Sequence, residues 1–243
     1  MKLLIVRHGD PDYVNDTLTE KGHREAALLA DRLSRENIKY AYVSPLGRAQ
    51  RTAEYTLKRI GLEGETLDWL REFPARINRP DVTDCKMILW DWLPADWTTE
   101  SEFYDKDKWS SHPVMKEGGV EEEFSYVTSG LDELLARHGY RRNGNIYDVE
   151  RANEDTVVFF CHFGLECVLL SRLLGISPMV LWHGFVAAPT SVTTVYTEER
   201  REGKASFRVA SFGDISHLYA GGEEPSLSAR FCETYNNTEQ RRD

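Results

Sequence analysis

Short apolar runs alternate along the chain with longer segments in which apolar residues recur every three or four positions. The runs at residues 2–6, 40–43 and 156–161 are bounded by polar or turn-forming residues, which predicts three buried strands. The last run, TVVFFC, is apolar throughout, as expected for a central parallel strand that is covered on both faces. The segments between these runs have helical spacing, so strands and helices are expected to alternate.

Two helices are predicted from the residues at their N-terminal ends. Thr19 is expected to cap a helix that starts in the segment TLTEKGHREA, because a threonine side chain can accept a hydrogen bond from a free amide of the first turn. Ser44 followed by Pro45 predicts the start of a second helix, since serine is a good N-cap and proline is favoured at the first helical position. This helix is expected to run through GRAQRTAEYTLKRI.

The remaining predicted elements follow the same rhythm of strands and helices. They are a short strand at 66–68, helices at 121–138 and 164–174, and strands at 191–197 and 205–212. Gly175 is expected to end the helix before it, because glycine readily adopts the left-handed conformation of a helix C-cap. The polar segment 141–155 is predicted to be an exposed loop.

Residues 73–120 interrupt this rhythm. The segment holds four of the six tryptophans and four of the nine prolines, and it has no long helical period. We therefore predict a cap-like insertion that covers the functional site. Its tryptophans either stack on a sugar or base of the substrate or pack in the core of the insertion, and these are Trp90, Trp92, Trp97 and Trp109.

The alternation of strands and helices predicts an α/β fold with three layers, αβα, and a mostly parallel central sheet. A chain of 243 residues is long enough for one such domain over 1–243, with the insertion inside it and a polar tail at 220–243. In sheets of this kind the ligand lies beyond the carboxyl ends of the strands. The functional site is therefore sought where the predicted strands end.

Composition restricts the classes of partner and location. The formal net charge of −10 disfavours broad nucleic-acid binding and attachment to a membrane through basic residues. No apolar run approaches the ~18 residues of a membrane span, and the run at residues 3–6 is too short for a signal peptide. The cysteines have neither CxxC nor metal-ligand spacing. We expect a cytoplasmic protein without metal or cofactor, while its oligomeric state is left open.

Histidines follow two of the predicted strands. Arg7 and His8 come directly after the first strand, and His162 follows the run TVVFFC in the same way. A neutral imidazole is a good nucleophile toward phosphorus, and nearby cations keep it neutral. His162 also opens a helix, whose N-terminal amides favour phosphate. Taken alone, His8 is better explained as a structural or exposed residue, whereas His162 is explained equally well as a structural residue and as a phosphate ligand.

An arginine and a carboxylate extend this candidate site. Arg48 stands in the first turn of the second helix, where a cation opposes the helix dipole, and binding of an anion would explain it. Glu72 follows the short strand at 66–68, and a carboxyl group near a phosphate can protonate the leaving oxygen. Asp10, next to Gly9, is the rival acid, and Glu72 can also be read as an ordinary surface carboxylate.

Five segments occur in an order and spacing that is similar to one known family. They are RHG at 7–9, DTLTEKGHREA at 16–26, SPLGRAQRTA at 44–53, LRE at 70–72 and CHFG at 161–164. Together they resemble the histidine phosphatase superfamily, which is phosphoglycerate mutase-like. The later segments PTSVTTVY and DISHL also look like the closing strand and C-terminal end of that family.

The resemblance implies roles for the candidate residues. His8 would be the nucleophile that forms a phosphohistidine, while Arg7, Arg48 and His162 would hold the phosphoryl group. Glu72 would protonate the leaving oxygen and then activate water. The substrate implied is a small phosphorylated metabolite, and no metal is required because three cationic side chains neutralise the phosphoryl oxygens.

The sequence also departs from the family pattern. Asn15 resembles an asparagine that contacts phosphate after RHG, although the spacing here is looser. CHFG stands where HGG-type sequences are commoner, so Phe163 is expected to narrow the pocket, and FPARINRP replaces a Gly-rich stretch typical of mutases. A phosphatase is therefore favoured, with a mutase-type phosphoryl transferase as the second reading and a non-catalytic phosphate-ligand binding protein as the third.

Three further residues near the predicted site carry two interpretations each. Arg76 and Arg79 either meet a second phosphate of the substrate or face water. His183, in LWHGF, either lines the pocket or is structural, and the structural interpretation is favoured.

Overall fold

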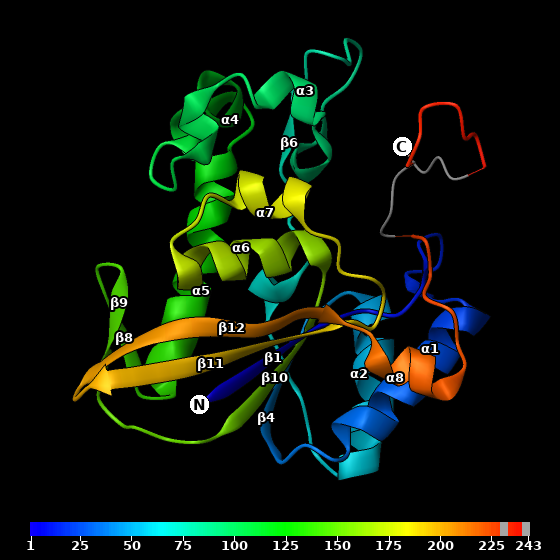
Figure 1. The fold of residues 1–243 in the computed structure, drawn as a ribbon, viewed down its shortest axis with the longest axis vertical. Coiled ribbons are helices and arrows are strands. Elements are labelled where there is room, and N and C mark those ends of the chain that lie inside the picture. The colour runs from blue at the N-terminus through cyan, green and yellow to red at the C-terminus, as the bar shows by residue number, and fades with distance from the viewer. Residues whose placement is uncertain (229–232, 240–243) are drawn as a thin grey trace.

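The computed structural model describes residues 1–228 and 233–239 (Figure 1). A sheet of eight strands forms its middle layer, in the order β5-β4-β10-β1-β11-β12-β9-β8. These strands are β1 (Lys2–Arg7), β4 (Ile38–Val43), β5 (Glu65–Thr66), β8 (Tyr140–Asn143), β9 (Ile146–Val149), β10 (Thr156–Cys161), β11 (Val192–Arg201) and β12 (Lys204–Asp214).

Helices cover both faces of this sheet. Thr19 caps the first of them by accepting a hydrogen bond from the amide of Gly22, and Gly175 ends the sixth with φ 68°, both as predicted. The helices are α1 (Glu20–Leu33), α2 (Gly47–Ile60), α3 (Pro94–Trp97), α4 (Pro113–Glu117), α5 (Val120–Arg137), α6 (Phe163–Leu174), α7 (Pro178–Gly184) and α8 (Ser216–Gly221).

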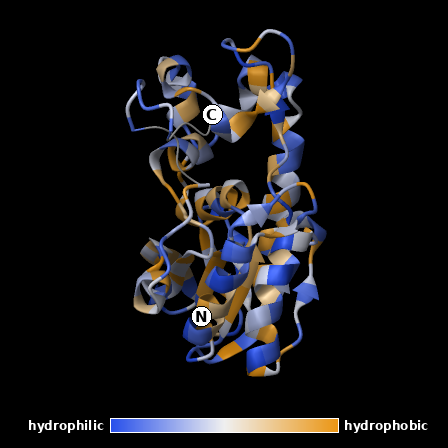
Figure 2. Ribbon diagram, turned by 90° about the vertical axis from the view of Figure 1, so that its right-hand side faces the viewer, coloured by the Kyte–Doolittle hydropathy of each residue, from blue (hydrophilic) through white to orange (hydrophobic). Residues whose placement is uncertain are grey.

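The side chains of the central strands alternate between two cores. In β1, Leu3 and Ile5 belong to the core under α5 and α6, whereas Leu4 and Val6 belong to the core shared with α1 and α2. Strands that are buried on both faces are apolar throughout, as the sequence of β10 indicated. Figure 2 shows the apolar strands enclosed by helices whose outer faces are polar. The three-layer α/β fold is thereby confirmed.

The sheet is mixed, which refines the expectation of a mostly parallel one. Among the described strands, β5, β4, β10 and β1 are parallel to one another, and the remaining pairings are antiparallel. The antiparallel part arises because β11 and β12 form a hairpin that closes between Arg201 and Lys204. A hairpin needs only a short turn, whereas parallel neighbours need a crossover connection.

Residues 141–155, predicted as a loop, largely form the hairpin of β8 and β9, and that prediction was wrong. Asn143 and Ile146 are paired across a two-residue turn, and Gly144 there has φ 59°. A positive φ at a two-residue hairpin turn is readily supplied by glycine. The fully buried Tyr147 anchors β9 by packing against Phe207 of β12, with ring centroids 4.9 Å apart.

The second helix begins later than Ser44 and Pro45 suggested. Its first residue is Gly47, and Leu46 provides no side-chain cap. The carboxylate of Asp16, from a distant turn, accepts a hydrogen bond from the Gly47 amide at 2.6 Å. A capping group supplied from elsewhere in the chain satisfies the free amide, so the helix does not need a cap from its own sequence.

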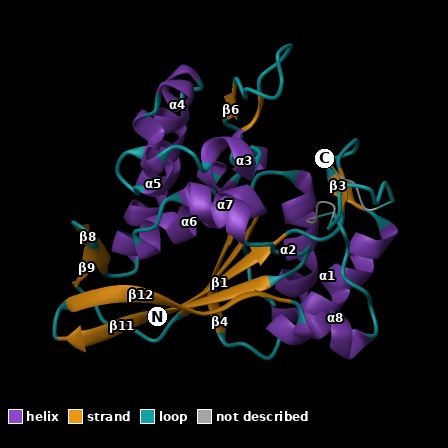
Figure 3. Cartoon of the chain, turned by 45° about the horizontal axis from the view of Figure 1, so that its top comes forward, coloured by secondary structure: helices purple, strands orange, loops and turns teal. Residues whose placement is uncertain are grey.

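Residues 73–120, the predicted insertion, lie above α6 and α7 in Figure 1, and Figure 3 shows α4 and β6 at the end farthest from the sheet. The segment contains a two-stranded ribbon and single helical turns instead of long helices. Three of its tryptophans are buried, and Trp109 packs against Trp182 of α7 with ring centroids 5.6 Å apart. The elements are β6 (Arg76–Ile77), β7 (Met87–Ile88), α3, α4 and the 3₁₀ turns Leu89–Asp91, Ser101–Tyr104 and Trp109–Ser111.

The first part of the predicted polar tail contacts α1 and the loop that follows β1. Glu223 forms ion pairs with Lys21 and Arg24, and the hydroxyl of Ser226 donates to the carboxylate of Asp10. Residues 229–232 and 240–243 lie outside the described part of the chain. Among the described residues, no helix is long and apolar enough to cross a membrane.

Candidate active site

The strand order brings the two predicted histidines together. Strands β1 and β10 are parallel neighbours, and Arg7 is paired with Cys161 at their carboxyl ends. The next residue of each strand is a histidine, and the rings of His8 and His162 have centroids 5.1 Å apart. Both side chains are buried, with 2% and 0% exposure. Two histidines that are far apart in the sequence therefore share one site at the sheet edge where ligands bind.

The ring of His8 is held in one tautomer. Its Nδ1 lies 2.8 Å from the carbonyl oxygen of Gly9. A carbonyl only accepts hydrogen bonds, so Nδ1 carries the proton and Nε2 keeps its lone pair. Burial, and then the charge of Arg7, lower the pKa of His8 well below its ordinary value. The imidazole is therefore neutral and nucleophilic at physiological pH.

His162 is connected to the end of the next strand. Its Nε2 lies 2.7 Å from the hydroxyl oxygen of Ser44, which follows β4 and also accepts a hydrogen bond from the Leu46 amide. Burial, and then the neighbouring His8, lower the pKa of His162 well below its ordinary value. The buried Nδ1 has no hydrogen-bond partner among the described residues. If the Ser44 hydroxyl donates to Nε2, Nδ1 carries a proton that is available to an anion.

Two arginines supply positive charge to this pocket. Nη1 of Arg7 donates to the carbonyl of Ala187 at 2.6 Å, and Nη1 of Arg48 donates to the carboxylate of Asp16 at the same distance. The Nε atoms of both arginines are buried and lack a partner within the described chain. Buried donors in native proteins are nearly always paired, so these two point to a missing acceptor such as an oxyanion.

Glu72 is attached to the N-terminus of α6. Its Oε1 accepts hydrogen bonds from the amides of Phe73 and Leu165, at 2.8 Å and 3.0 Å. Desolvation by the surrounding protein raises the pKa of Glu72, against the opposing charge of Arg7. A side chain at position 164 would lie within 2.7 Å of Oε1, so Gly164 is required for this approach. Oε1 thus fixes the carboxylate in place, and no hydrogen bond to Oε2 is found among the described residues.

The rival acid and the predicted asparagine are engaged elsewhere. Asp10 accepts hydrogen bonds from the hydroxyls of Thr19 and Ser226, so it joins α1 to the C-terminal segment. Asn15 is exposed, and its amide donates to the carboxylate of Asp12 at 2.8 Å. The structure therefore does not bring Asn15 into the pocket, because its side chain closes the turn that carries it.

Aromatic residues form one wall of the site. Phe163 lies edge-on to Trp90 of the insertion, with ring centroids 6.5 Å apart, and Trp90 donates to the carbonyl of Phe73 at 3.2 Å. Trp92, Trp97 and Trp109 are instead buried within the insertion. Of the four tryptophans, Trp90 is the one that reaches Phe163 among the ring contacts of the described residues.

The other candidates of the insertion and α7 are paired away from His8. Arg79 is bound by the carboxylates of Asp81 and Asp91, and Arg76 is exposed. His183 donates through Nδ1 to the carbonyl of Met179 at 2.7 Å, and burial lowers its pKa to about 4. The ion pairs of Arg79 and the hydrogen bond of His183 are contacts of the kind that stabilise a fold.

Sequence reasoning missed three residues that lie next to the predicted site residues. Ser44 was taken as a helix cap, but it holds His162. Glu166, one turn into α6, is 1% exposed, and burial raises its pKa to about 7. Tyr13 stacks on Arg48, as described below. A carboxylate within the apolar run of α6 was a visible signal for Glu166, whereas Tyr13 had none.

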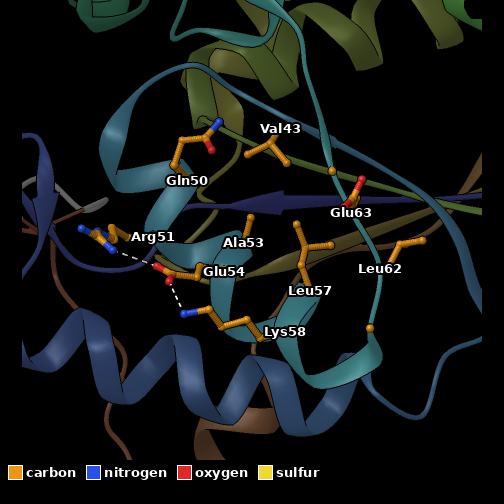
Figure 4. A pocket seen from close by; sticks show the side chains of 11 residues that line it. Val43, Gln50, Arg51, Ala53, Glu54, Leu57, Lys58, Leu62 and Glu63 are labelled. Atoms are coloured by element: carbon orange, nitrogen blue, oxygen red, sulfur yellow. Dashed lines mark hydrogen bonds and ion pairs between the residues drawn. The ribbon is translucent and has the colours of Figure 1, made fainter.

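A groove elsewhere on the surface is separate from this site. It measures about 690 Å³ and lies between α2 and residues 61–64 (Figure 4). Arg51 and Lys58 both pair with Glu54 at its rim, and Leu57 lies at its apolar side. None of the predicted site residues lines this groove, so it is not the candidate site.

Sequence comparison finds relatives among phosphatases and phosphoglycerate mutases. Phosphoserine phosphatase 1 of Hydrogenobacter thermophilus is 25% identical over 214 residues, which cover 83% of this chain and 89% of that protein. A 2,3-bisphosphoglycerate-dependent phosphoglycerate mutase of Bartonella tribocorum is 36% identical over 109 residues, which cover 40% of this chain and 51% of the mutase.

Solved structures show the same fold at low sequence identity. A phosphoserine phosphatase mutant from Entamoeba histolytica, in complex with phosphoserine, matches with a TM-score of 0.58, 20% identity, and coverage of 89% of this chain and 98% of that chain. A mycobacterial glucosyl-3-phosphoglycerate phosphatase matches with a TM-score of 0.57, 20% identity, and coverage of 87% and 98%.

The family assignment rests on the extent of the sequence match. The histidine phosphatase superfamily (branch 1) matches residues 3–209, which include β1 with His8 and β10 with His162. Because this match spans most of the chain, the protein belongs to the histidine phosphatase superfamily.

Proposed function

We propose that the protein is a phosphatase that hydrolyses a small phosphomonoester through a phosphohistidine on His8. The observation that carries this proposal is the state of His8, whose Nδ1 is held by the Gly9 carbonyl so that Nε2 is free to attack. Its lowered pKa keeps the ring neutral, and cations flank it. Phosphatases among the relatives and structural neighbours support the same reaction class.

In the first step the lone pair of His8 Nε2 forms a bond to phosphorus while the bond to the leaving oxygen breaks. Arg7, Arg48 and His162 offer donors to the phosphoryl oxygens, and the two arginines neutralise the negative charge of these oxygens. Glu72 gives its proton to the leaving alcohol oxygen, for which its raised pKa is suited. The alcohol then departs, and the phosphoryl group remains on His8.

In the second step water attacks the phosphohistidine. The Glu72 carboxylate takes a proton from the attacking water, and the bond between phosphorus and His8 Nε2 breaks. Inorganic phosphate leaves, His8 recovers its lone pair, and Glu72 is protonated again for the next turnover. The positive charge that this scheme needs comes from side chains of the chain itself.

Hydrolysis of a panel of phosphomonoesters in the presence of EDTA tests this proposal. We expect the wild-type activity to survive EDTA and the His8→Ala variant to lose at least about a thousand-fold in kcat, because the covalent step is removed. An acid-labile phosphoenzyme should accumulate in the wild type. His23→Ala is a matched control, since His23 is the side chain of α1 that contacts Tyr55 on the surface. Full activity in His8→Ala would overturn the mechanism.

The fate of the phosphoryl group separates the phosphatase from the alternatives. A mutase must return the phosphoryl group to a second oxygen, so stimulation by 2,3-bisphosphoglycerate would favour the mutase. A non-catalytic protein would bind phosphate without turnover. One structural neighbour is a phosphoserine phosphatase with phosphoserine bound, and another is a glucosyl-3-phosphoglycerate phosphatase. Small phosphorylated metabolites are therefore the substrates to test first. The cytoplasmic location remains a prediction.

A further inference from the structure

Tyr13 lies across the two arginines of the pocket although its side chain faces solvent. It stands in the turn between β2 (Pro11–Asp12) and β3 (Thr17–Leu18) and is 64% exposed. Its ring covers the guanidinium of Arg48, with Cζ 5.4 Å from the ring centroid. Its hydroxyl lies near the Arg7 guanidinium, where it raises the pKa of Arg7 against the larger, lowering effect of burial. One exposed side chain thus stacks on one of the two cations that the proposed function assigns to the phosphoryl group and lies near the other.

The turn is fixed by contacts that do not involve the Tyr13 ring. The carboxylate of Asp12 accepts from the amides of Val14 and Asn15, at 3.1 Å and 3.2 Å. On the other side Asp16 binds both the Gly47 amide and Arg48. The backbone of Tyr13 is therefore held over the pocket by its neighbours, and removal of the hydroxyl should leave the turn in place.

A surface tyrosine stacked on an arginine needs no function by itself, and Tyr126 shows this. Its ring lies over Arg71, with Cζ 5.2 Å from the centroid, and it is 45% exposed. Arg71 donates through Nη2 to both carboxylate oxygens of Glu123, at 2.8 Å and 2.9 Å. Arg7 and Arg48 differ from Arg71, because each keeps a buried Nε without a partner in the described chain.

The chemistry of the phenol completes this contrast. The phenol hydroxyl carries one proton that it can donate. A phosphoryl oxygen bound to Arg7 would be an acceptor in the right place, and hydrogen bonds to charged groups are the stronger ones. The ring meanwhile shields Arg48 from water, which strengthens the attraction between Arg48 and an anion.

We propose that Tyr13 is a phosphate-binding residue, whose hydroxyl donates a hydrogen bond to a phosphoryl oxygen held by Arg7 while its ring covers Arg48. This inference rests on the proposed function, because it places the phosphoryl group between the same arginines. The hydroxyl contacts bound phosphate before and during the reaction, so it contributes equally to substrate and transition-state binding.

Comparison of Tyr13→Phe with Tyr126→Phe tests the proposal. Binding of inorganic phosphate is measured by titration calorimetry, and KM and kcat are measured with a phosphomonoester that the wild type hydrolyses. In Tyr13→Phe we expect Kd and KM to rise about ten-fold while kcat stays within about two-fold, since one charge-assisted hydrogen bond is lost. Tyr126→Phe should match the wild type in all three constants.

The possible outcomes separate this inference from the proposed function. If Tyr13→Phe binds phosphate as tightly as the wild type does, the role of the hydroxyl is overturned while the phosphatase stands. If Tyr126→Phe weakens phosphate binding equally, the effect is not specific to the pocket and the inference also fails. If the wild type neither binds phosphate nor hydrolyses phosphomonoesters, the proposed function is overturned, and the role of Tyr13 falls with it.

Discussion

The pocket at the strand ends and the insertion each contain a largely buried arginine, but the two use it differently. In the insertion, Arg79 is bound by Asp81 and Asp91, and Nε donates to Asp81 at 3.0 Å. In the pocket, Arg48 has one carboxylate partner, Asp16, and its Nε has none within the described residues. A saturated guanidinium stabilises the fold around it, whereas an incompletely paired one can receive a ligand.

This contrast shows why the sequence alone could not separate the two arginines. From the sequence, Arg48 was a candidate to bind the phosphoryl group, and Arg79 was a candidate to bind a second phosphate of the substrate. Their partners in the fold, and not their place in the sequence, distinguish a ligand-binding role from a structural one.

Exchange of each arginine for alanine should produce opposite effects. Arg48→Ala is expected to lower kcat/KM about a thousand-fold, because it removes a preorganised donor to the phosphoryl group, with little change in stability. Arg79→Ala should leave kcat/KM within about three-fold but lower the free energy of unfolding by about 2 kcal/mol, because two carboxylates lose their partner. Steady-state kinetics and urea unfolding of both variants measure this. An equal loss of activity in Arg79→Ala would extend the functional site into the insertion.

The role of Glu72 can be separated from that of Asp10 by the leaving group. Glu72→Gln keeps a similar shape but cannot donate the proton, so hydrolysis of alkyl phosphates should slow about a hundred-fold. Hydrolysis of p-nitrophenyl phosphate, whose leaving group needs no proton, should slow much less. Asp10→Asn is the matched control and should show no such dependence, because Asp10 binds Thr19 and Ser226. The reverse pattern would transfer the acid role to Asp10.

The smallest expected effect comes from a change at Glu166, and it alters the pH dependence of the free energy of unfolding. Its carboxyl lies near Arg7, Glu72, Cys161, Cys167 and the Thr193 hydroxyl, and no well-formed hydrogen bond to it exists among the described residues. Burial raises its pKa from 4.5 to about 7. Below pH 4.5 both the folded and the unfolded chain carry the proton. As the pH rises, the unfolded chain releases it first, so stability falls until the pH passes 7.

Replacement by glutamine removes this titration. Glu166→Gln should therefore gain stability over the wild type by about 2 kcal/mol more at pH 8.5 than at pH 5.5. Urea unfolding at the two pH values measures the difference. A gain that is the same at both would show that Glu166 does not titrate with a raised pKa.

The family and the main elements could be predicted because their signals are local. Arg7 and His8 follow an apolar run, Thr19 caps its own helix, and the order of five motifs matches the histidine phosphatase superfamily, which is confirmed. The proximity of His8 and His162 was expected from the rule on strand ends. The two histidines are close because β1 and β10 are neighbours in the sheet, and no local sequence pattern predicts this strand order.

What could not be predicted depends on contacts between distant segments. The start of α2 is decided by Asp16, which caps it from the turn after β2, so the pair Ser44 and Pro45 was misleading. The same turn points Asn15 toward Asp12 and places Tyr13 over Arg48. Turns of this kind are defined by side-chain hydrogen bonds whose partners spacing alone does not reveal.

The pairing of β1 with β10 also has a consequence for how the chain folds. Arg7 and Cys161 lie far apart in the sequence, and a large part of the chain must be enclosed before they meet. Contacts of this range form slowly compared with helices. The pair of His8 and His162 in the candidate site would thus be assembled late on the folding route, after α1 and α2 can already exist. Return of the proposed phosphatase activity during refolding would then report completion of the central sheet, since partly folded chains would lack the assembled site.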